Sequence, residues 1–392
     1  MIVVGGVYSE RVSYPPTDEL FGSGLKAAAA LSSLSRVTLI ACVSRKELPA
    51  AISASKTYGF KYRFTPRPHP ISFSYVTPLT KPLILGLPKS TIPISAFGNA
   101  VLAFGMVESS QIIRAQRLTI DPQSPTEAAL SQFRGHKAKH LAIVLNRQEA
   151  IRIGKTNDLR KAGRNIQKRA SASVVVIKHG ALGVLVLDRS KSSWIGVHPT
   201  RSVWPIGSGD VFSGVFAWAW GERKFSPLKA AILASAGTAA WCSTRVIPLA
   251  KDFHKHINKL SPAILIKQPP RVYIAGPFFS ASQVWLLEVV KGALENLGAK
   301  TFSPLHHVGR GEDEVAAKDL AGLKKCSSVL ALLVEEDAGT LFEVGYARAN
   351  KIPVIGFAAA HKSSKFKMLR GTGIKMYPEL STAIYRAIWE CR

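Results

Sequence analysis

The sequence predicts an α/β protein built from mostly parallel sheets with helices on their faces. Short apolar runs typical of buried strands alternate along the chain with longer helical stretches. Such alternation favours a parallel sheet, because each crossover lays a helix on a sheet face. A basic, polar segment at residues 251–270 ends in Pro-Pro, and a strand pattern restarts after it. We therefore expect two domains in the 392 residues, 1–250 and 271–392, joined by a linker at 251–270.

The positive charge is distributed unevenly. The formal net charge is +27, and residues 1–270 hold 36 Lys and Arg against 13 Asp and Glu, a net of +23. Residues 271–392 hold 16 against 12, a net of +4, and the basic residues are densest at 134–169. This excess can attract nucleic acid, nucleotides or an acidic partner. An ordinary solvated surface is the alternative, and nucleic-acid binding is the less favoured interpretation, because no aromatic-interleaved binding motif accompanies the charge.

The cysteines and the apolar runs bear on the compartment. Four isolated cysteines, none in a CxxC pair, favour a reduced cytoplasm without a structural metal. The opening MIVVGG is typical of a first strand and not of a signal peptide. No apolar stretch reaches the about 18 residues that a membrane span needs, so we expect no membrane partner.

The elements of the first domain follow from apolar periodicity. Strands are expected at residues 2–4, 37–43, 118–120, 141–145, 174–177 and 184–187. An Ala-rich helix at 25–34 can pack close to a ligand or a sheet. Residues 64–93 hold seven prolines, which favours edge strands or a flap.

A glycine-rich turn, Gly207-Ser208-Gly209, leads into a helix that carries Asp210 in its first turn. Backbone N–H groups at such a helix start form a cradle for an anion. Asp210 is placed to accept a proton from a substrate hydroxyl during phosphoryl transfer. A tight turn with an N-terminal acid would give the same four residues, so both interpretations stay open.

Residues 1–250 resemble the PfkB (ribokinase-like) family of sugar and nucleoside kinases, which have an α/β/α fold. The GSGD segment is similar to the family's GAGD signature, and Asp121-Pro122-Gln123 to its DPN-type strand end. Residues 177–183 are similar to its T-L-G-x-x-G turn. The resemblance implies that Asp210 is the catalytic base. It also implies an anion hole formed by Gly207, Ser208 and Gly209.

Asn146 and Glu149 resemble the family's NxxE motif. The resemblance implies that these two residues help to arrange magnesium and phosphate. ATP and Mg²⁺ are therefore the expected cofactors of this domain.

Two departures from the family pattern concern the sugar. Residues 7–10 supply no aspartate after the first strand, and residues 22–28 lack the asparagine of the GG-x-x-x-N motif. We therefore expect either an unusual acceptor or nucleotide binding without turnover.

In the second domain, Val329–Val334 predicts a buried strand, followed by a turn rich in acid and glycine. A helix is expected to open near Thr340 with Glu343 in its first turn, which puts Asp337 and Glu343 at the carboxyl end of a strand. Open α/β sheets place their ligand crevices there. Two carboxylates near an apolar wall can take different pKa values, so that one is ionised and the other protonated. Such a pair suits reaction at an acetal-like carbon, where one acid attacks the carbon and the other transfers a proton. Acids that only complement the helix dipole are the alternative.

Four further elements of this domain are expected. They are strands at 271–275 and 352–357 and helices at 282–297 and 313–326. His306 and His307 form a loop pair without a third ligand in view, so no metal is assigned.

Residues 271–392 resemble the nucleoside 2-deoxyribosyltransferase family, which has a flavodoxin/Rossmann-like parallel sheet. Residues 273–279 are similar to its Y-x-x-G/A-x-F-F opening, 319–323 to its D-L-x-x-I segment, and 337–347 to its D-x-G-T-x-x-E-x-G-x-A core. One departure is Cys326-Ser327, where many members carry an acid. The resemblance implies that Glu343 attacks the anomeric carbon, because a carboxylate stabilises an oxocarbenium-like centre.

The same resemblance implies roles for other positions. Tyr273 would orient Glu343, and Asp319 and Asp337 would contact the departing base and assist its protonation. The remaining matched positions expected to contact substrate are Ala275, Gly276, Phe278, Phe279, Gly339 and Thr340. The two phenylalanines would stack the nucleobase, with plain core packing as the alternative. The family also implies a homo-oligomer and no cofactor for this domain.

Two functional hypotheses follow. In the first, the protein cleaves or exchanges the N-glycosidic bond of (deoxy)nucleosides or their phosphates, and the kinase-like half binds ATP and phosphorylates a sugar or nucleoside. In the second, it is a nucleotide-depleting effector, for instance in antiviral defence, and the basic kinase-like half is a non-catalytic sensor or a nucleic-acid-binding module. A scaffold with two decayed sites is weaker, because Asp319, Asp337 and Glu343 are all present. Transfer or hydrolysis, and the presence of a 5′-phosphate, stay open.

Overall fold

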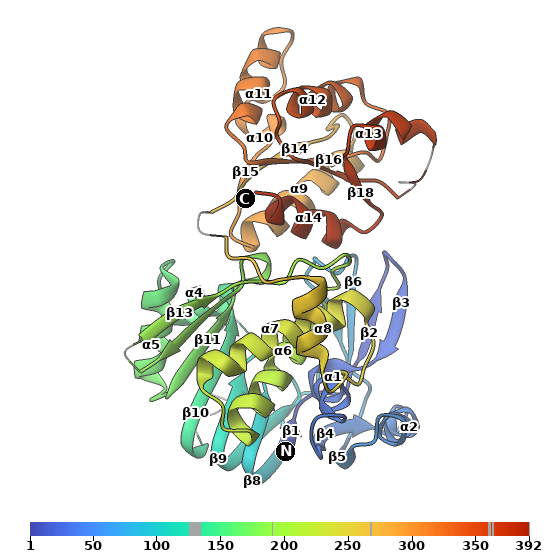
Figure 1. The fold of residues 1–392 in the computed structure, drawn as a ribbon. Helices are drawn as coiled ribbons and strands as arrows, with labels where there is room; N and C mark the ends of the chain where they lie inside the picture. The colour runs from blue at the N-terminus through green and yellow to red at the C-terminus, as the bar shows by residue number, and fades with distance from the viewer. Residues whose placement is uncertain (125–134, 190, 267–268, 360–361, 363, 392) are drawn as a thin grey trace. The chain divides into compact units, whose positions relative to one another are not determined.

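The computed structural model describes residues 1–124, 135–189, 191–266, 269–359, 362 and 364–391. The chain divides into two compact units. The first comprises Met1–Thr200 and Trp204–Ala263, and the second Arg201–Val203 and Ile264–Arg392. Each unit is an α/β fold with its own sheet and core (Figure 1). The predicted fold class is confirmed.

The first unit is built on a nine-stranded sheet in the order β13-β12-β11-β10-β9-β8-β1-β4-β5. Its strands are β1 (Ile2–Val4), β4 (Thr38–Ser44), β5 (Lys61–Arg67), β8 (Ile92–Phe104), β9 (Ser109–Asp121), β10 (Lys137–Asn146), β11 (Val174–Lys178), β12 (Val184–Asp188) and β13 (Lys191–Ile195). Neighbours pair in parallel except at β11–β12 and β12–β13. The expected pair of adjacent strands at 174–177 and 184–187 is therefore present.

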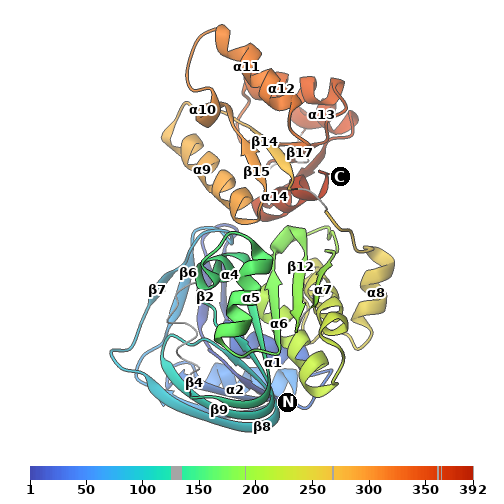
Figure 2. The same cartoon turned by 90° about the vertical axis from the view of Figure 1, so that its left-hand side faces the viewer.

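Helices cover both faces of this sheet (Figure 2). Successive side chains of β11 point to opposite faces, so Val174 and Val176 enter one core and Val175 and Ile177 the other. The first core is closed by α1 (Gly22–Leu31), α6 (Ser208–Phe216), α7 (Pro227–Thr244) and α8 (Phe253–Leu260). The second core is closed by α4 (Arg147–Gly154) and α5 (Leu159–Arg169). The helix α2 (Leu48–Tyr58) and the π-helical segment η2 (Ala217–Glu222) complete this unit's longer helices among the described residues.

A separate four-stranded sheet has the order β3-β2-β6-β7. Its strands are β2 (Ser9–Val12), β3 (Thr17–Leu20), β6 (Ser72–Tyr75) and β7 (Leu83–Leu85). The proline-rich segment was expected to supply edge strands or a flap. It supplies part of β5, an edge strand of the main sheet, and the strands β6 and β7 of the small sheet. Pro66 lies in β5, the last strand of the main sheet, where a missing N–H breaks no second ladder.

Two helices differ from expectation. Helix α1 begins at Gly22, earlier than predicted, because glycines allow its first turn to lie against the end of β1. A Cβ on Gly24 would lie 2.5 Å from the carbonyl carbon of Gly5. Residues 253–260, expected to belong to a linker, form α8, because Phe253 and Ile257 lie one turn apart and are both buried.

The second unit contains an all-parallel five-stranded sheet in the order β15-β14-β16-β17-β18. Its strands are β14 (Arg271–Ala275), β15 (Lys300–Phe302), β16 (Ser328–Leu332), β17 (Val354–Phe357) and β18 (Lys375–Tyr377). Its helices are α9 (Ala281–Asn296), α10 (Pro304–His307), α11 (Glu314–Lys324), α12 (Ala338–Ala349), α13 (Lys367–Gly371) and α14 (Leu380–Trp389). Helices α11 and α12 cover one face of the sheet, and α9 and α14 cover the other (Figure 1).

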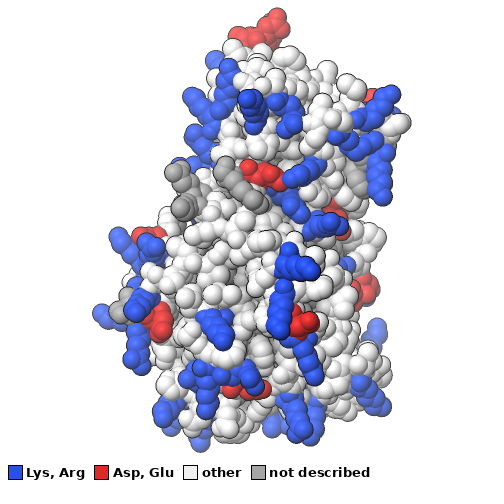
Figure 3. Space-filling model, in the orientation of Figure 1, with Lys and Arg blue, Asp and Glu red and all other residues white. Residues whose placement is uncertain are grey.

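Charged side chains are dispersed over the visible surface. In Figure 3, Lys and Arg are separated by uncharged surface and do not gather in one continuous patch. Arg134, the first residue of the basic-rich segment, lies outside the described residues. Within the described part of the chain, no helix is both long and apolar enough to cross a membrane. The charge excess therefore does not by itself mark a nucleic-acid surface on this face.

Candidate active sites

In the second unit, a tyrosine and a glutamate meet at the carboxyl end of the sheet. Tyr273 lies in β14, and its hydroxyl donates a hydrogen bond of 2.5 Å to Oε1 of Glu343 on α12. The Tyr273 side chain is fully buried, and its ring stacks on Phe302 with centroids 5.5 Å apart. The tyrosine is thus held by packing, and it fixes one oxygen of the carboxylate.

Helix α12 owes its start to Asp337, which is its N-cap. Oδ2 of Asp337 accepts hydrogen bonds from the backbone N–H and the hydroxyl of Thr340, both at 2.6 Å. Because this cap starts the helix at Ala338, Glu343 lies in the second turn; its predicted position in the first turn was wrong. The sequence left open that Asp337 complements the helix dipole, and a carboxylate at the N-cap position does so.

A third carboxylate, Asp319 of α11, belongs to the same cluster. Its Oδ1 is buried and has no hydrogen-bond partner among the described residues. Burial raises the pKa of Glu343 to about 7, the hydrogen bond from Tyr273 opposes this, and the charges of Asp319 and Asp337 add to it. Burial also raises the pKa of Asp319. The structure thus brings together the four residues Tyr273, Asp319, Asp337 and Glu343.

The expected substrate-contacting residues lie in different environments. Ala275 and Gly276 are buried at the end of β14, where a Cβ on Gly276 would lie 3.0 Å from Cβ of Leu332. Phe278 and Phe279 stack with ring centroids 5.4 Å apart, and Phe279 is 73% exposed. Core packing therefore does not account for Phe279. Gly339 is exposed beside the carboxylate of Asp337.

The histidine pair of this unit has protein partners. Nε2 of His306 lies 2.7 Å from Oε1 of Glu288. The His307 ring stacks on Phe302, with centroids 4.7 Å apart. These contacts give both rings a local structural role.

In the first unit, the GSGD turn opens α6 as expected, with Asp210 in the first turn. Gly207 has φ +80°, and a Cβ there would lie 2.6 Å from Nζ of Lys26, so only glycine fits. Ser208 donates both its N–H and its hydroxyl to the carbonyl of Pro205, at 3.0 and 2.7 Å. Both donors of Ser208 are therefore used within the turn.

Asp210 is almost fully buried, and its Oδ1 accepts a hydrogen bond of 2.7 Å from Nε2 of Gln123. Burial raises its pKa to about 7, against the opposing charge of Lys26. A carboxyl group with such a pKa can accept a proton near neutral pH.

Asn146 and Glu149 form the capping box of α4. Oδ1 of Asn146 accepts from the N–H of Glu149 at 2.9 Å, and Oε2 of Glu149 accepts from the N–H of Asn146 at 2.7 Å. Burial raises the pKa of Glu149 to about 7, with the charge of Asp121 adding to it. Both expected phosphate-site residues thus have a structural role at the helix start.

Sequence reasoning missed two buried lysines at this site. Nζ of Lys178, at the end of β11, lies 2.7 Å from Oδ2 of Asp121. Nζ of Lys26, in α1, lies 2.7 Å from Oε2 of Glu10. The available signal was their place in the sequence, since Lys26 interrupts an Ala-rich helix and Lys178 ends an apolar strand.

The residues do not fit the divalent metal ion that the kinase resemblance implies. Among the described residues, no group of three or more His, Cys, Asp or Glu side chains could hold a metal. Oδ1 of Asp121 accepts from the N–H of Gln123 at 3.3 Å, and Oδ2 accepts from Lys178 and, at 2.6 Å, from Ser213. Both oxygens of this carboxylate are therefore already bonded to protein donors.

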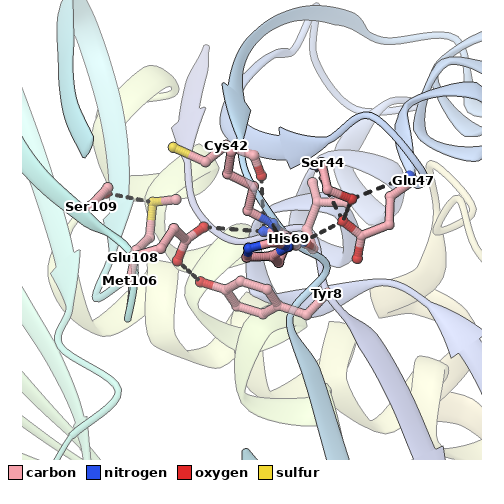
Figure 4. Close-up of polar contacts among 10 residues, drawn as sticks. Tyr8, Cys42, Ser44, Glu47, His69, Met106, Glu108 and Ser109 are labelled. Atoms are coloured by element: carbon pink, nitrogen blue, oxygen red, sulfur yellow. Dashed lines mark hydrogen bonds and ion pairs between the residues drawn. The ribbon is translucent and has the colours of Figure 1, made fainter. Parts of the chain in front are cut away.

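A second buried network fills the carboxyl ends of β1, β4 and β5 (Figure 4). Arg67 lies 2.6 Å from Glu47 and 3.4 Å from Glu108, and the hydroxyl of Tyr8 donates to Glu108 at 2.5 Å. Arg67 also donates to the carbonyl oxygens of Val7, Cys42 and His69. Protein side chains thus occupy this part of the sheet edge, where α/β folds usually place ligands.

The two units match the models of two different protein families. Residues 115–247 match the model of the pfkB family carbohydrate kinases, and residues 272–374 match that of the nucleoside 2-deoxyribosyltransferases. The chain is a ribokinase-family kinase domain followed by a nucleoside 2-deoxyribosyltransferase domain. Both predicted resemblances are confirmed.

The chain is similar to several solved structures, all at low identity. A pyrophosphate-dependent kinase of the ribokinase family, complexed with a pyrophosphate analog and myo-inositol, is 18% identical over 65% of this chain and 100% of its own, with a TM-score of 0.46. Phosphofructokinase-2 from Escherichia coli with substrates and products is 16% identical over 66% and 98%, at 0.48. A probable sugar kinase from Rhizobium etli CFN 42 is 12% identical over 66% and 97%, also at 0.48. No curated protein matches the chain.

Proposed function

We propose that the second unit cleaves or exchanges the N-glycosidic bond of a (deoxy)nucleoside or its phosphate, with Glu343 as nucleophile. The observation that carries this proposal is the hydrogen bond from Tyr273 to Glu343 beside the two further carboxylates. The tyrosine fixes one oxygen of the half-buried Glu343, and the carboxylate lies where parallel sheets place ligands.

The chemistry requires two different protonation states. The ionised carboxylate of Glu343 attacks the anomeric carbon, and the bond from that carbon to the base nitrogen breaks as the ester bond forms. The base leaves with the bonding electrons and takes a proton from a carboxylic acid. Asp319 is suited to this, because burial raises its pKa and its Oδ1 has no partner among the described residues. A second base or a water molecule then attacks the anomeric carbon, the bond from that carbon to the oxygen of Glu343 breaks, and the carboxylate of Asp319 takes up the proton that the incoming base or water loses.

The exposed aromatic Phe279 is suited to stack on the nucleobase, with Phe278 behind it. Gly339 and Thr340 lie at the start of α12 beside Asp337, and Ala275 and Gly276 lie at the end of β14. In this proposal they contact the sugar. A homo-oligomer that completes the site remains part of the proposal, and light scattering of the purified protein tests it.

The test is release of free base from a mixed pool of nucleosides, deoxynucleosides and their 5′-phosphates, measured by mass spectrometry. Glu343→Gln removes the nucleophile and keeps the size of the side chain, so base release should fall by a factor of about 10³ or more. Glu295→Gln, on the exposed face of α9, is the matched control and should keep the wild-type rate. Base release by Glu343→Gln at the wild-type rate would exclude the proposed nucleophile.

For the first unit, we propose nucleotide binding at the GSGD turn, with Asp210 as the base if a sugar or nucleoside is phosphorylated. The position of Asp210 and its pKa of about 7 support this. ATP consumption by the full chain across a panel of sugars and nucleosides tests it. Steady turnover on one acceptor supports a kinase, whereas consumption that no acceptor stimulates argues against it.

A second candidate function is favoured by the filled end of β1. The ring of Tyr8 covers Gly6, where a Cβ would lie 2.0 Å from Cε2 of the tyrosine, and Glu10 is paired with Lys26. These residues follow the first strand, where the kinase family holds its sugar. We therefore propose, as the alternative, a nucleotide-depleting effector whose kinase-like unit senses a nucleotide or a polyanion without turnover. Binding of a nucleotide or nucleic acid that changes base release, without ATP consumption, would favour it.

A further inference from the structure

Lys178 lies where three elements of the first unit meet. Its Nζ is 2.7 Å from Oδ2 of Asp121, at the end of β9, and 3.4 Å from the hydroxyl of Ser213 in α6. A Cβ added to Gly209 would lie 3.2 Å from the same nitrogen. The Lys178 side chain is 16% exposed and that of Asp121 is 3% exposed. The ammonium group is therefore a fixed, largely buried charge directly beside the GSGD turn.

Three carboxylates interact electrostatically with this ammonium group. They belong to Asp121, Glu149 and Asp210, which come from β9, α4 and α6. A cation among three buried carboxylates offsets the electrostatic repulsion between them. A bound metal ion has the same effect in other sites. Here the chain supplies that cation itself, and both oxygens of Asp121 are bonded to protein donors.

A second lysine lies on the other side of the turn. A Cβ on Gly207 would lie 2.6 Å from Nζ of Lys26, and Lys26 is only 2% exposed. An ammonium group has three hydrogen-bond donors. Among the described residues, Nζ of Lys178 has two side-chain acceptors and Nζ of Lys26 has one, which leaves each ammonium group a donor for an anion at the turn.

We propose that Lys178 replaces the divalent metal ion of this site, and that a polyphosphate binds at the GSGD turn between Lys178 and Lys26 without such an ion. The ligand class is a nucleoside triphosphate or inorganic pyrophosphate, which share the polyphosphate chain. The inference rests on the proposed nucleotide binding of the first unit and specifies how that binding is achieved.

The test is isothermal titration calorimetry of the full wild-type chain with ATP and, separately, with inorganic pyrophosphate. Each titration is done once with EDTA and once with MgCl₂. The expected result is a dissociation constant that agrees within about threefold between the two conditions, a difference of less than about 0.7 kcal/mol. Binding of both ligands indicates recognition of the polyphosphate alone, and binding of ATP only indicates added contacts to the nucleoside.

The negative outcomes separate the inference from the proposed function. Binding that requires MgCl₂ would overturn the inference and leave nucleotide binding intact. Absence of binding in both conditions would remove the inference together with the nucleotide-binding role of the first unit. Base release by the second unit is measured independently and would stand in either case.

Variants locate the effect at the lysine. Lys178→Met removes the charge and should weaken polyphosphate binding in EDTA by about tenfold or more, with MgCl₂ restoring part of it. Lys56→Met, on the exposed side of α2, is the matched control and should change nothing. If Lys178→Met does not fold, the double variant Asp121→Asn/Lys178→Met keeps the charge balance and should lose affinity in the same way. Wild-type affinity in either Lys178 variant would contradict the proposal.

Discussion

Replacing Tyr273 by phenylalanine should shift the pH dependence of base release to higher pH. The hydroxyl of Tyr273 donates to Glu343 and so favours the ionised carboxylate, opposing the burial that raises the pKa of Glu343 to about 7. Below that pH the wild-type carboxyl group is mostly protonated and cannot attack the sugar carbon. In the wild type, kcat/KM should therefore fall about tenfold per pH unit on the acidic side.

The size of the shift follows from the single hydrogen bond that is lost. A hydrogen bond to a charged group contributes about 1.5–3 kcal/mol, and one pKa unit corresponds to about 1.36 kcal/mol. The pKa of Glu343 should thus rise by about one to two units in Tyr273→Phe. At pH 7 this lowers kcat/KM by roughly fivefold to fiftyfold, and the loss should shrink as the pH approaches 9.

The assay is a pH profile of kcat/KM for base release, because this ratio reports ionisation of the free enzyme. Phenylalanine keeps the stacking on Phe302, so the fold should persist and the unfolding midpoint should change little. Tyr346→Phe, on the same helix as Glu343, is the matched control and should leave the profile unchanged. A uniform loss at all pH values in Tyr273→Phe, with the acidic limb unmoved, would refute this reasoning.

Three further substitutions in the first unit test packing and capping. Arg67→Met leaves two buried carboxylates without their cation. The free energy of unfolding, measured with urea, should fall by about 3–5 kcal/mol. An unchanged midpoint of urea unfolding would show that the network contributes nothing to stability. Gly207→Ala places a side chain on a backbone with φ +80°. It should abolish polyphosphate binding and lower the free energy of unfolding by at least about 1 kcal/mol. Wild-type binding affinity in this variant would contradict the tight turn. Asn146→Ala removes one half of a capping box and should cost about 1 kcal/mol without changing polyphosphate affinity; a loss of affinity would instead favour a ligand-binding role.

The C-terminal site could be predicted well because its signals are local. Parallel strands end at the same edge, so residues following β14 and β16 had to meet there. The position of Glu343 within α12 was less certain, because helix starts depend on which residue acts as the N-cap. Asp337 takes that position, which moves Glu343 into the second turn without removing it from Tyr273.

The lysines of the first unit could not be predicted, because their partners are set by strand order. Lys178 and Asp121 end the strands β11 and β9, which lie on either side of β10. Lys26 lies in a helix whose alanines indicated close packing, and its partners in the structure are Glu10 of β2 and the rings of Phe21 and Trp241. A sequence pattern predicts which face of a helix or strand is buried. Which buried charges pair can be predicted only when the order of the strands in the sheet is known.

Arg67 illustrates the same limit. The prolines around it predicted edge strands, and β5 is an edge strand of the main sheet. The carboxylates of Glu47 and Glu108 come from α2's N-terminal side and from the turn after β8, which no local pattern joins to β5. Ion-pair geometry thus decides which side chains fill this edge of the sheet.

The acceptor end of the first unit is where a kinase and a sensor differ most. Asp210 can take up a proton near pH 7, but one of its oxygens already accepts from Gln123. Burial, followed by the charges of Glu10 and Asp210, raises the pKa of Tyr75 in β6, so this tyrosine lies within electrostatic reach of both carboxylates. For the proposed phosphoryl transfer, the acceptor hydroxyl group would have to bind the other oxygen of Asp210. The proposed polyphosphate binding does not involve that oxygen, because it depends on Lys26 and Lys178 beside Gly207 and Gly209. The proposal of anion binding at the GSGD turn therefore makes fewer demands on the structure than the proposal of phosphoryl transfer, which also needs an acceptor at Asp210.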